Sequence, residues 1–248
     1  MIIIVMVLGL LFGSFYNVCI YRLPVGKSVV MPRSSCGSCG HVLNGLDMVP
    51  VLSYVLSLGK CRHCGAKYSP RYALVELLTG GLFVISYLTF GYTWMCLVGI
   101  VLSSIVIIVT FIDIDHHIIL DRFSVITMVL GVLYHVFLTD MSLVNIGLGF
   151  LLGGGILFLI AILGTMGGGD IKIMASFGVI LGFPKVLMAL YLSFVIGAVI
   201  LTPIVLYQKK KFGEYKSQVP FGPFLCIGTW VTFYFGDFLF DLYLTIFM

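Results

Sequence analysis

Apolar residues in this 248-residue chain gather in windows of about 20, and short polar stretches divide the windows. Each window is long enough for one helix to cross a bilayer, and none alternates with the period of two that a barrel strand needs. We therefore predict an all-α polytopic membrane protein with about eight transmembrane helices in a lipid bilayer. The windows fall at residues 2–21, 72–90, 94–112, 123–139, 143–165, 171–183, 184–206 and 221–247.

Composition supports this class. Hydrophobic residues make up 60% of the chain and charged residues 10%, and the mean hydropathy is +1.17. These values exclude a soluble globular protein. The first window has no basic stretch before it and no small-residue cleavage site after it, so we expect it to remain as a helix. The net charge of +4 is explained by the basic loops that set membrane topology, and we expect no nucleic-acid partner.

Two basic loops predict the orientation in the membrane. The polar region 22–71 has basic side chains and one acid, Asp47, and the second loop lies at 207–219. Basic loops stay in the cytoplasm, so both are expected there. The basic residues are Arg22, Lys27, Arg33, Lys60, Arg62, Lys67 and Arg71 in the first loop, and Lys209, Lys210, Lys211 and Lys216 beside Glu214 in the second.

An even number of crossings must then separate the two loops. Residues 171–206 supply two of them if the helix breaks at Gly182-Phe183-Pro184, because proline cannot continue a helix. The helix at 171–183 is then a short span, and both termini lie outside. We predict three parts: a first transmembrane helix (1–21), a cytoplasmic metal-binding region (22–71) and a membrane domain (72–248).

Four cysteines in the cytoplasmic region have the spacing of a metal site. Cys36 and Cys39 form one CxxC pair, and Cys61 and Cys64 form another. Two such pairs supply four thiolates in tetrahedral geometry, which is typical of structural Zn²⁺. A closed site of this kind leaves no open position for catalysis. Disulfides or free thiols are the alternative, and His41 or His63 could replace one thiol, although we interpret both histidines as bystanders.

The remaining cysteines, Cys19, Cys96 and Cys226, are interpreted as small buried residues of the spans.

Two aspartates stand at membrane boundaries. Asp113 follows the window 94–112, and Asp170 follows three glycines, Gly167 to Gly169. A carboxylate at such a place is energetically costly, which indicates a functional role. Two aspartates brought together by helix packing can share one proton and activate a water. Asp115 and Asp121 are interpreted as solvated loop charges, with Asp121 also a candidate cap of the next helix.

Five glycines lie in the window 143–165, where small residues allow helices to approach closely in lipid. They are Gly147, Gly149, Gly153, Gly154 and Gly155.

Taken together, these motifs closely resemble those of the type IV prepilin peptidases, the GxGD family of membrane aspartic proteases. The similarity covers most of the chain. Asp113 matches the first catalytic aspartate of that family and Asp170 the second. The other matching residues are Gly13 to Val18, Arg22, Pro24, Arg33, Ser34, Pro50, Ser53, Gly59, Tyr72, Glu76, Gly167, Gly169, Lys172 and Pro220 to Pro223, together with the four cysteines at 36, 39, 61 and 64.

The resemblance implies a membrane aspartic endopeptidase. Its substrates would be prepilins or pseudopilins of type IV pilus systems, which carry a short basic leader and are cut at the cytoplasmic face. The short chain is similar to competence-type enzymes of Gram-positive bacteria. The resemblance also implies N-methylation of the new N-terminus by S-adenosylmethionine, for which the residues themselves indicate no binding pocket. One departure is Leu120, which stands where the family has proline before an Asp or Asn, here Asp121.

Other classes of protein fit the sequence less well. A proton-coupled transporter could use boundary carboxylates, but it would place them nearer the bilayer midplane, with internal repeats. A zinc enzyme would need an open metal position. A presenilin-like protease would leave the four cysteines unexplained. Lys172, His116 and His117 are candidates for tuning the acidic site, and an ordinary role at the membrane boundary is equally consistent with their positions.

Overall fold

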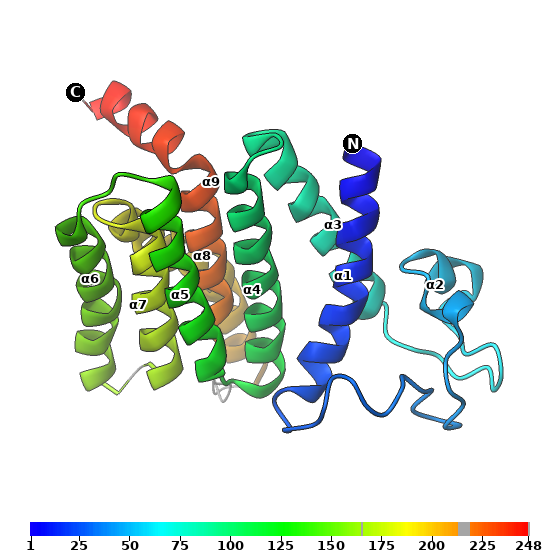
Figure 1. The fold of residues 1–248 in the computed structure, drawn as a ribbon. Helices are drawn as coiled ribbons and strands as arrows, with labels where there is room; N and C mark the ends of the chain where they lie inside the picture. Colours follow the sequence, from blue (N-terminus) through cyan, green and yellow to red (C-terminus); the bar gives the residue numbers. More distant parts are fainter. Residues whose placement is uncertain (165, 213–218, 248) are drawn as a thin grey trace. The chain divides into compact units, whose positions relative to one another are not determined.

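The structure of the protein, a computed structural model, describes residues 1–164, 166–212 and 219–247. Within those residues the chain is all-helical, with two isolated β-bridges and no strand. Ten helices follow one another (Figure 1). They are α1 (Ile2–Arg22), the 3₁₀ helix η1 (Gly45–Met48), α2 (Leu52–Leu56), α3 (Arg71–Phe90), α4 (Trp94–His116), α5 (Asp121–Leu138), α6 (Leu143–Ile162), α7 (Gly168–Leu181), α8 (Lys185–Phe212) and α9 (Gly222–Phe247).

These helices confirm the predicted membrane class. In the described part of the chain, seven helices are long and apolar enough to cross a bilayer, and α7 is the short eighth. The second basic loop begins later than predicted, because α8 continues to Phe212 and includes Lys209 and Lys210. Glu214 and Lys216 lie outside the described residues. The chain forms two compact units, unit 1 (Met1–Ile108) and unit 2 (Val109–Met248), and α4 contributes to both.

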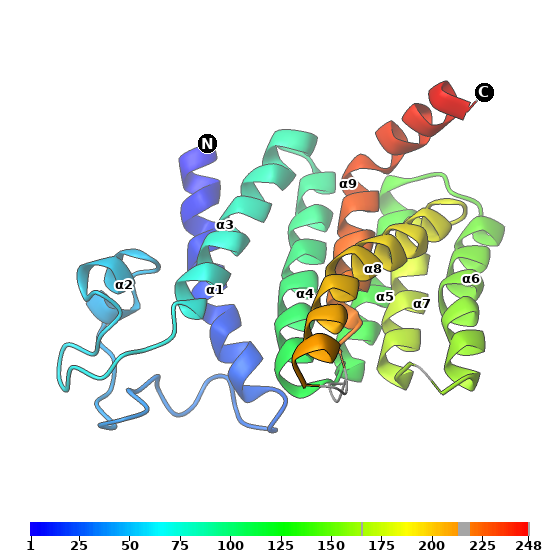
Figure 2. The ribbon, with the colours of Figure 1, turned by 180° about the vertical axis from the view of Figure 1, so that it is seen from behind.

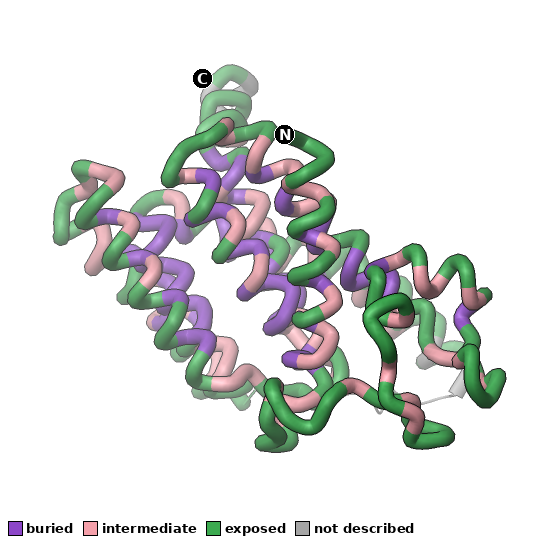
Figure 3. The backbone as a smooth tube through the Cα atoms, turned by 45° about the vertical axis from the view of Figure 1, so that its right-hand side comes forward, coloured by how far each residue is buried: buried purple, intermediate pink, exposed green. Residues whose placement is uncertain are grey.

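In unit 1, α1 packs along α3. The contact is close because α1 has glycines where it faces α3. A Cβ atom at Gly9 would lie 2.7 Å from the Cα of Gly80, and one at Gly13 would lie 2.7 Å from the Cα of Glu76. Small residues at such a contact allow two helices to pack in lipid, where no hydrophobic effect drives them together. The region between α1 and α3 is mostly exposed, and only Pro50 and Gly59 are buried in it (Figure 3).

In unit 2, α7 is the central helix. It contacts α5, α6, α8 and α9 (Figures 1 and 2). Its residues Ile173 to Leu181 are all buried, which is expected of a helix that is surrounded on every side. Its 14 residues span about 21 Å, less than the roughly 30 Å of a bilayer core. The surrounding helices therefore allow a helix this short to cross the unit.

The predicted close packing of the window 143–165 is confirmed in part. Gly149 faces the carbonyl of Gly178 on α7, Gly153 faces the carbonyl of Met174, and Gly154 faces Ala175. The prediction was wrong for Gly147 and Gly155, where an added Cβ would meet no described atom within 4 Å.

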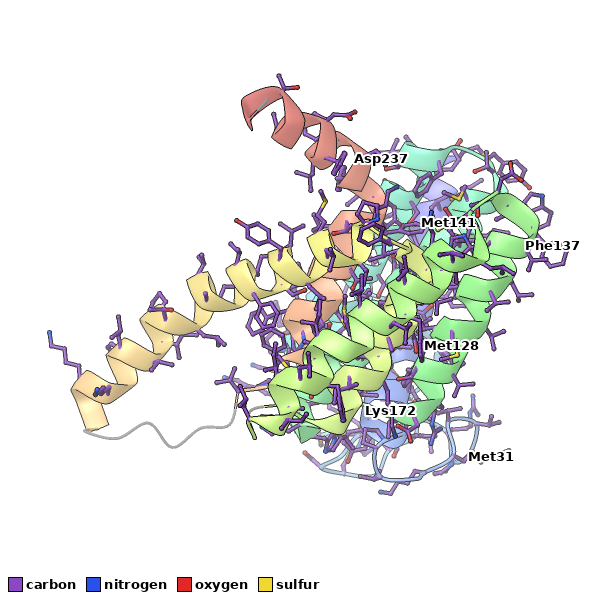
Figure 4. The ribbon with its side chains drawn as sticks, turned by 90° about the vertical axis from the view of Figure 1, so that its left-hand side faces the viewer. Met31, Met128, Phe137, Met141, Lys172 and Asp237 are labelled. Carbon is purple, nitrogen blue, oxygen red and sulfur yellow. The ribbon has the colours of Figure 1, made fainter. Side chains whose placement is uncertain are left out.

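The predicted break between α7 and α8 is confirmed at residues 182–184. Gly182 ends α7 with φ of +66°, and the N–H of Phe183 donates to the carbonyl oxygen of Asn145 at 3.2 Å. Met141 also packs against Gly182. The connections α5–α6 and α7–α8 therefore meet at one end of unit 2. Figure 4 shows Met141 and Asp237 at that end and Lys172 at the other.

Candidate functional site

Asp113 lies inside α4 rather than after it. The predicted window ended at residue 112, but the helix continues through His116 and ends before His117, which has φ of +54°. The prediction was wrong because hydropathy falls at the first charge, whereas the backbone hydrogen bonds of a helix continue past it. Asp113 is therefore a helical residue, and it is only 5% exposed.

The carboxylate of Asp113 is bound by the first residue of another helix. Its Oδ2 atom accepts a hydrogen bond of 2.9 Å from the N–H of Gly222, where α9 begins. The first N–H groups of a helix have no partner within the helix, so they are available to an acceptor. A Cβ at residue 222 would lie 2.6 Å from this oxygen, so a larger residue there would have to displace the Asp113 carboxylate or the start of α9.

Asp170 lies in the first turn of α7. Its Oδ2 accepts from the N–H of Gly167 at 3.3 Å. A Cβ at Gly169 would lie 3.0 Å from the Cβ of Ile119, in the connection between α4 and α5. The glycine run thus lets the start of α7 approach that connection. This packing brings Asp170 close enough to Asp113 for their charges to interact.

The two carboxylates form an arrangement that can do acid–base chemistry. Like charges held close together in a buried site disfavour the doubly ionised state, so a pair of this kind can share one proton. One member can then remove a proton while the other donates one. The sequence predicts no role for Gly222, and the signal that could have indicated one is a glycine between Pro220 and Pro223 at the start of a helix.

Asp121 and Lys172 form an ion pair beside this centre. Both carboxylate oxygens of Asp121 accept from Lys172 Nζ at 2.9 Å, and both side chains are largely exposed. The prediction that Asp121 is a candidate cap of α5 was wrong. The cap position of this helix is Leu120, and Asp121 is the first helical residue. Leu120 has φ of −74°, a value that proline also adopts, so the backbone at this position is compatible with the proline of the family pattern.

The four cysteines meet in unit 1. The Sγ atoms of Cys36, Cys39, Cys61 and Cys64 all lie within 4.8 Å of one another, and those of Cys36 and Cys64 are 3.9 Å apart. A tetrahedral ion with bonds of about 2.3 Å separates its sulfurs by about 3.8 Å. The cluster therefore fits zinc. All four cysteines are free, as are the buried Cys19, Cys96 and Cys226, which confirms the predicted burial of those three.

Two matching turns build this cluster. Gly40 and Gly65 have φ of +71° and +73° and donate to the carbonyl oxygens of Cys36 and Cys61. The β-bridges Ser35 to Val42 and Lys60 to Lys67 close the turns. The rings of His41 and His63 stack on each other with centroids 4.7 Å apart. Among the described residues, the group that could hold a metal ion consists of the four cysteines, without either histidine.

The turns favour thiolates at some positions and not at others. The backbone N–H groups of Cys39 and Ser38 lower the pKa of Cys36 to about 6. The N–H of Ala66 lowers the pKa of Cys64, but the neighbouring cysteine sulfurs raise it to about 11. Four thiolates at this spacing thus repel one another, and a bound cation would relieve that repulsion.

A buried acid anchors the same region to the membrane helices. Glu76 on α3 is 8% exposed, and its Oε2 accepts from the N–H of Val51 at 2.7 Å. Val51 has φ of +62°, which is strained for a β-branched residue. The hydrogen bond from the N–H of Val51 to Glu76 helps to hold that conformation and connects the cysteine region to α3.

Comparisons with known proteins give matches to two family models. Residues 7–90 match the Bacterial Peptidase A24 N-terminal domain, and residues 100–202 match the Type IV leader peptidase family. The first match contains the four cysteines and the second contains both aspartates.

Curated relatives extend the similarity over the whole chain. A protein of Bacillus subtilis (strain 168) is 32% identical over 98% of each chain. Relatives from Aeromonas hydrophila and Neisseria gonorrhoeae are 30% identical and cover 99% and 93% of this chain, and 94% and 89% of their own. All three are named prepilin leader peptidase/N-methyltransferase. No solved structure matches the chain.

Proposed function

Because this chain belongs to the type IV leader peptidase family, we propose that it is a membrane aspartic endopeptidase that removes the leader from prepilins or pseudopilins. The observation that supports the proposal is that Asp113 and Asp170 lie close enough at one end of unit 2 for their charges to interact. The alternative of a proton-coupled transporter is not favoured, since relatives with the peptidase name match the chain over its whole length.

The catalytic residues of the proposal are Asp113 and Asp170. The ionised aspartate takes a proton from water, and that water attacks the carbonyl carbon of the scissile peptide bond. The protonated aspartate donates to the carbonyl oxygen, and the pair then supports departure of the amine. The burial of Asp113 supports this role, since a low-dielectric site keeps the proton shared.

Cleavage of a synthetic substrate tests the proposal. Purified protein in detergent is incubated with a peptide that has a short basic leader followed by an apolar segment. We expect one cut at the leader boundary, detected by mass spectrometry. A matched peptide with glutamates in place of the leader lysines should be cut much more slowly. Absence of the specific cut by folded protein would contradict the proposal.

The four cysteines are proposed to bind one structural Zn²⁺. The spacing of the Sγ atoms supports this, and zinc would supply cross-links to a region that buries few residues of its own. Zinc has no catalytic step in this proposal.

The names of the relatives support a second activity, N-methylation of the new N-terminus, for which we propose S-adenosylmethionine as the methyl donor. Incubation of the cleaved peptide with labelled S-adenosylmethionine should transfer the label to its N-terminal amine. Absence of transfer under conditions that allow cleavage would separate the two activities.

We propose that the aspartates face the cytoplasm, since the basic region 22–71 is expected there. Single cysteines in an otherwise cysteine-free variant can be labelled in intact cells with an impermeant maleimide, after correct insertion has been checked. Positions 91–93 and 140–142 should label from outside, and positions 117–119 only after permeabilisation. The same expectations for Met248 (outside) and 213–215 (inside) concern positions outside the described residues. Labelling of 117–119 from outside would place the aspartates on the wrong side.

A further inference from the structure

We infer that Gly222 is a positioning residue that assigns the roles of the two aspartates. Its backbone N–H holds Asp113 as the ionised base, which leaves Asp170 to carry the shared proton. The inference rests on the proposed peptidase function, and it decides a question that the sequence leaves open.

The direction of the hydrogen bond carries the first step. A backbone N–H can only donate, and the acceptor here is Oδ2 of Asp113 at 2.9 Å in a buried setting. Donation to a carboxylate favours its charged form. Gly222 is also the first residue of α9, a helix of 26 residues, and the N-terminus of a helix has a partial positive charge that favours a nearby anion.

The corresponding contact of Asp170 is weaker. Its donor is the N–H of Gly167 at 3.3 Å, beyond the usual 2.7–3.2 Å range of N–H···O bonds, and it lies in an exposed setting. Asp170 also lies at a helix N-terminus. The partial positive charges at the starts of α7 and α9 therefore favour a negative charge on both aspartates to a similar extent. The shorter, buried bond to Asp113 then decides where the single negative charge resides.

Other groups around Asp113 do not move the single negative charge from Asp113 to Asp170. Among the described residues, the titratable groups whose charges interact with Asp113 include Asp170 from α7, Cys226 from α9 and His117 just beyond its own helix. A positive His117 would add to the preference for an ionised Asp113. Asp121, at the start of α5, is paired with Lys172.

The assignment gives a balanced reaction. Asp113 takes one proton from water as the water oxygen bonds to the carbonyl carbon, and Asp170 gives its proton to the carbonyl oxygen. When the intermediate collapses, the C–N bond breaks, and Asp113 passes its proton to the leaving nitrogen. Asp170 takes back the hydroxyl proton as the carboxylic acid product forms, so the pair returns to its starting state.

The N–H of Gly222 can be removed without adding an atom. Cell-free translation with a suppressor tRNA that carries glycolic acid replaces this amide with an ester. The same change at Gly228, further along α9, is the matched control for an ester in this helix. The pH dependence of kcat/KM for prepilin peptide cleavage is measured for both, and again with His117→Gln to remove the titration of that histidine.

In the protein with the ester at residue 222, we expect the acidic limb of the pH profile of kcat/KM to move up by about one pH unit. At a given acidic pH, this shift is a loss of about ten-fold in kcat/KM. The alkaline limb of the profile should be unchanged. The acidic limb reports formation of the single anion, which the N–H stabilises only if that anion is on Asp113. If the charge were on Asp170, the alkaline limb would move instead, because Asp113 would ionise second. That outcome, equal movement of both limbs, or no movement would each overturn the inference.

A second variant, Gly222→Ala, provides a test if the protein with the ester does not fold. Gly222→Ala places a methyl group 2.6 Å from Asp113 Oδ2 and should lower kcat at least ten-fold with little change in KM. Gly155→Ala, which meets no described atom within 4 Å, is its control and should behave as wild type. Because alanine keeps the N–H, this variant tests whether Oδ2 of Asp113 must stay within reach of that group, and a wild-type acidic limb in a folded Gly222→Ala protein would overturn the inference. Failure of the peptidase proposal is distinguishable, because the wild-type protein would then not cleave.

Discussion

The four cysteines come from the single stretch Cys36–Cys64, whereas the aspartate centre combines the end of α4 with the starts of α7 and α9. In the cysteine cluster, each pair of ligands is held by its own tight turn, with hydrogen bonds between residues a few positions apart. In the aspartate centre, the hydrogen bond between Asp113 and Gly222 joins residues far apart in the chain.

This difference has a physical consequence. A site built from local turns can form when its own segment closes around a metal, whereas a site built from several helix ends needs correct packing of the whole bundle. The two centres should therefore fail independently, and the cysteine cluster should be insensitive to packing changes in unit 2. Each variant below tests that independence, in order of expected effect.

The largest effect is expected from the aspartates. Asp113→Asn and Asp170→Asn should each lower cleavage by about 1,000-fold or more, because the pair loses its base or its acid. Elemental analysis should show the same zinc content as wild type. Asp121→Asn is the control and should retain most activity, since Asp121 makes only an exposed ion pair. Substantial turnover by either of the first two variants would remove the aspartic mechanism.

The complementary variant, Cys36→Ser/Cys61→Ser, changes the cysteine cluster and leaves both aspartates in place. It should lose the roughly one equivalent of zinc expected for wild type, and residues 22–71 should become much more sensitive to proteolysis. The folded fraction should still cleave peptide, because zinc has no catalytic part. The control His41→Gln/His63→Gln should keep its metal. A zinc content near zero in carefully prepared wild-type protein would contradict the site.

A packing variant sharpens the comparison further. Gly149→Ala would push a methyl group into the Gly178 carbonyl of α7, which is backbone and cannot move aside easily. We expect a loss of about 1–3 kcal/mol in unfolding free energy. Cleavage should also fall, about ten-fold, because α7 carries Asp170.

The measurements are denaturant unfolding in detergent micelles, peptide cleavage and zinc content. Gly155→Ala on the same helix should match wild type in all three, since it meets no described atom. If Gly149→Ala changed zinc content, the independence of the two centres would be refuted.

The smallest effect is expected at the Asp121–Lys172 ion pair. Exposed pairs contribute about 0–1 kcal/mol, so Lys172→Gln should lower stability by less than about 1 kcal/mol and activity by less than ten-fold. A charge swap, Asp121→Lys/Lys172→Asp, should recover most of any loss. A loss of activity as large as that of Asp170→Asn would show that Lys172 belongs to the catalytic centre itself.

Much of this molecule was predictable from local pattern. Apolar windows predicted the membrane helices, because a bilayer requires each crossing segment to be apolar and long. The CxxC spacing predicted the cysteine cluster, because a tight turn fixes two sulfurs without distant help. The break at Gly182 to Pro184 predicted where α7 ends, because proline cannot continue a helix.

Tertiary structure decided the remaining features. The packing of Gly149 but not Gly155 and the partner of Asp121 both depend on which helix faces which. The sequence predicted two important aspartates without distinguishing them. Their difference arises from the N–H of Gly222, which every residue except proline possesses. Its meaning depends on the placement of α9 beside α4, and that placement results from helix packing.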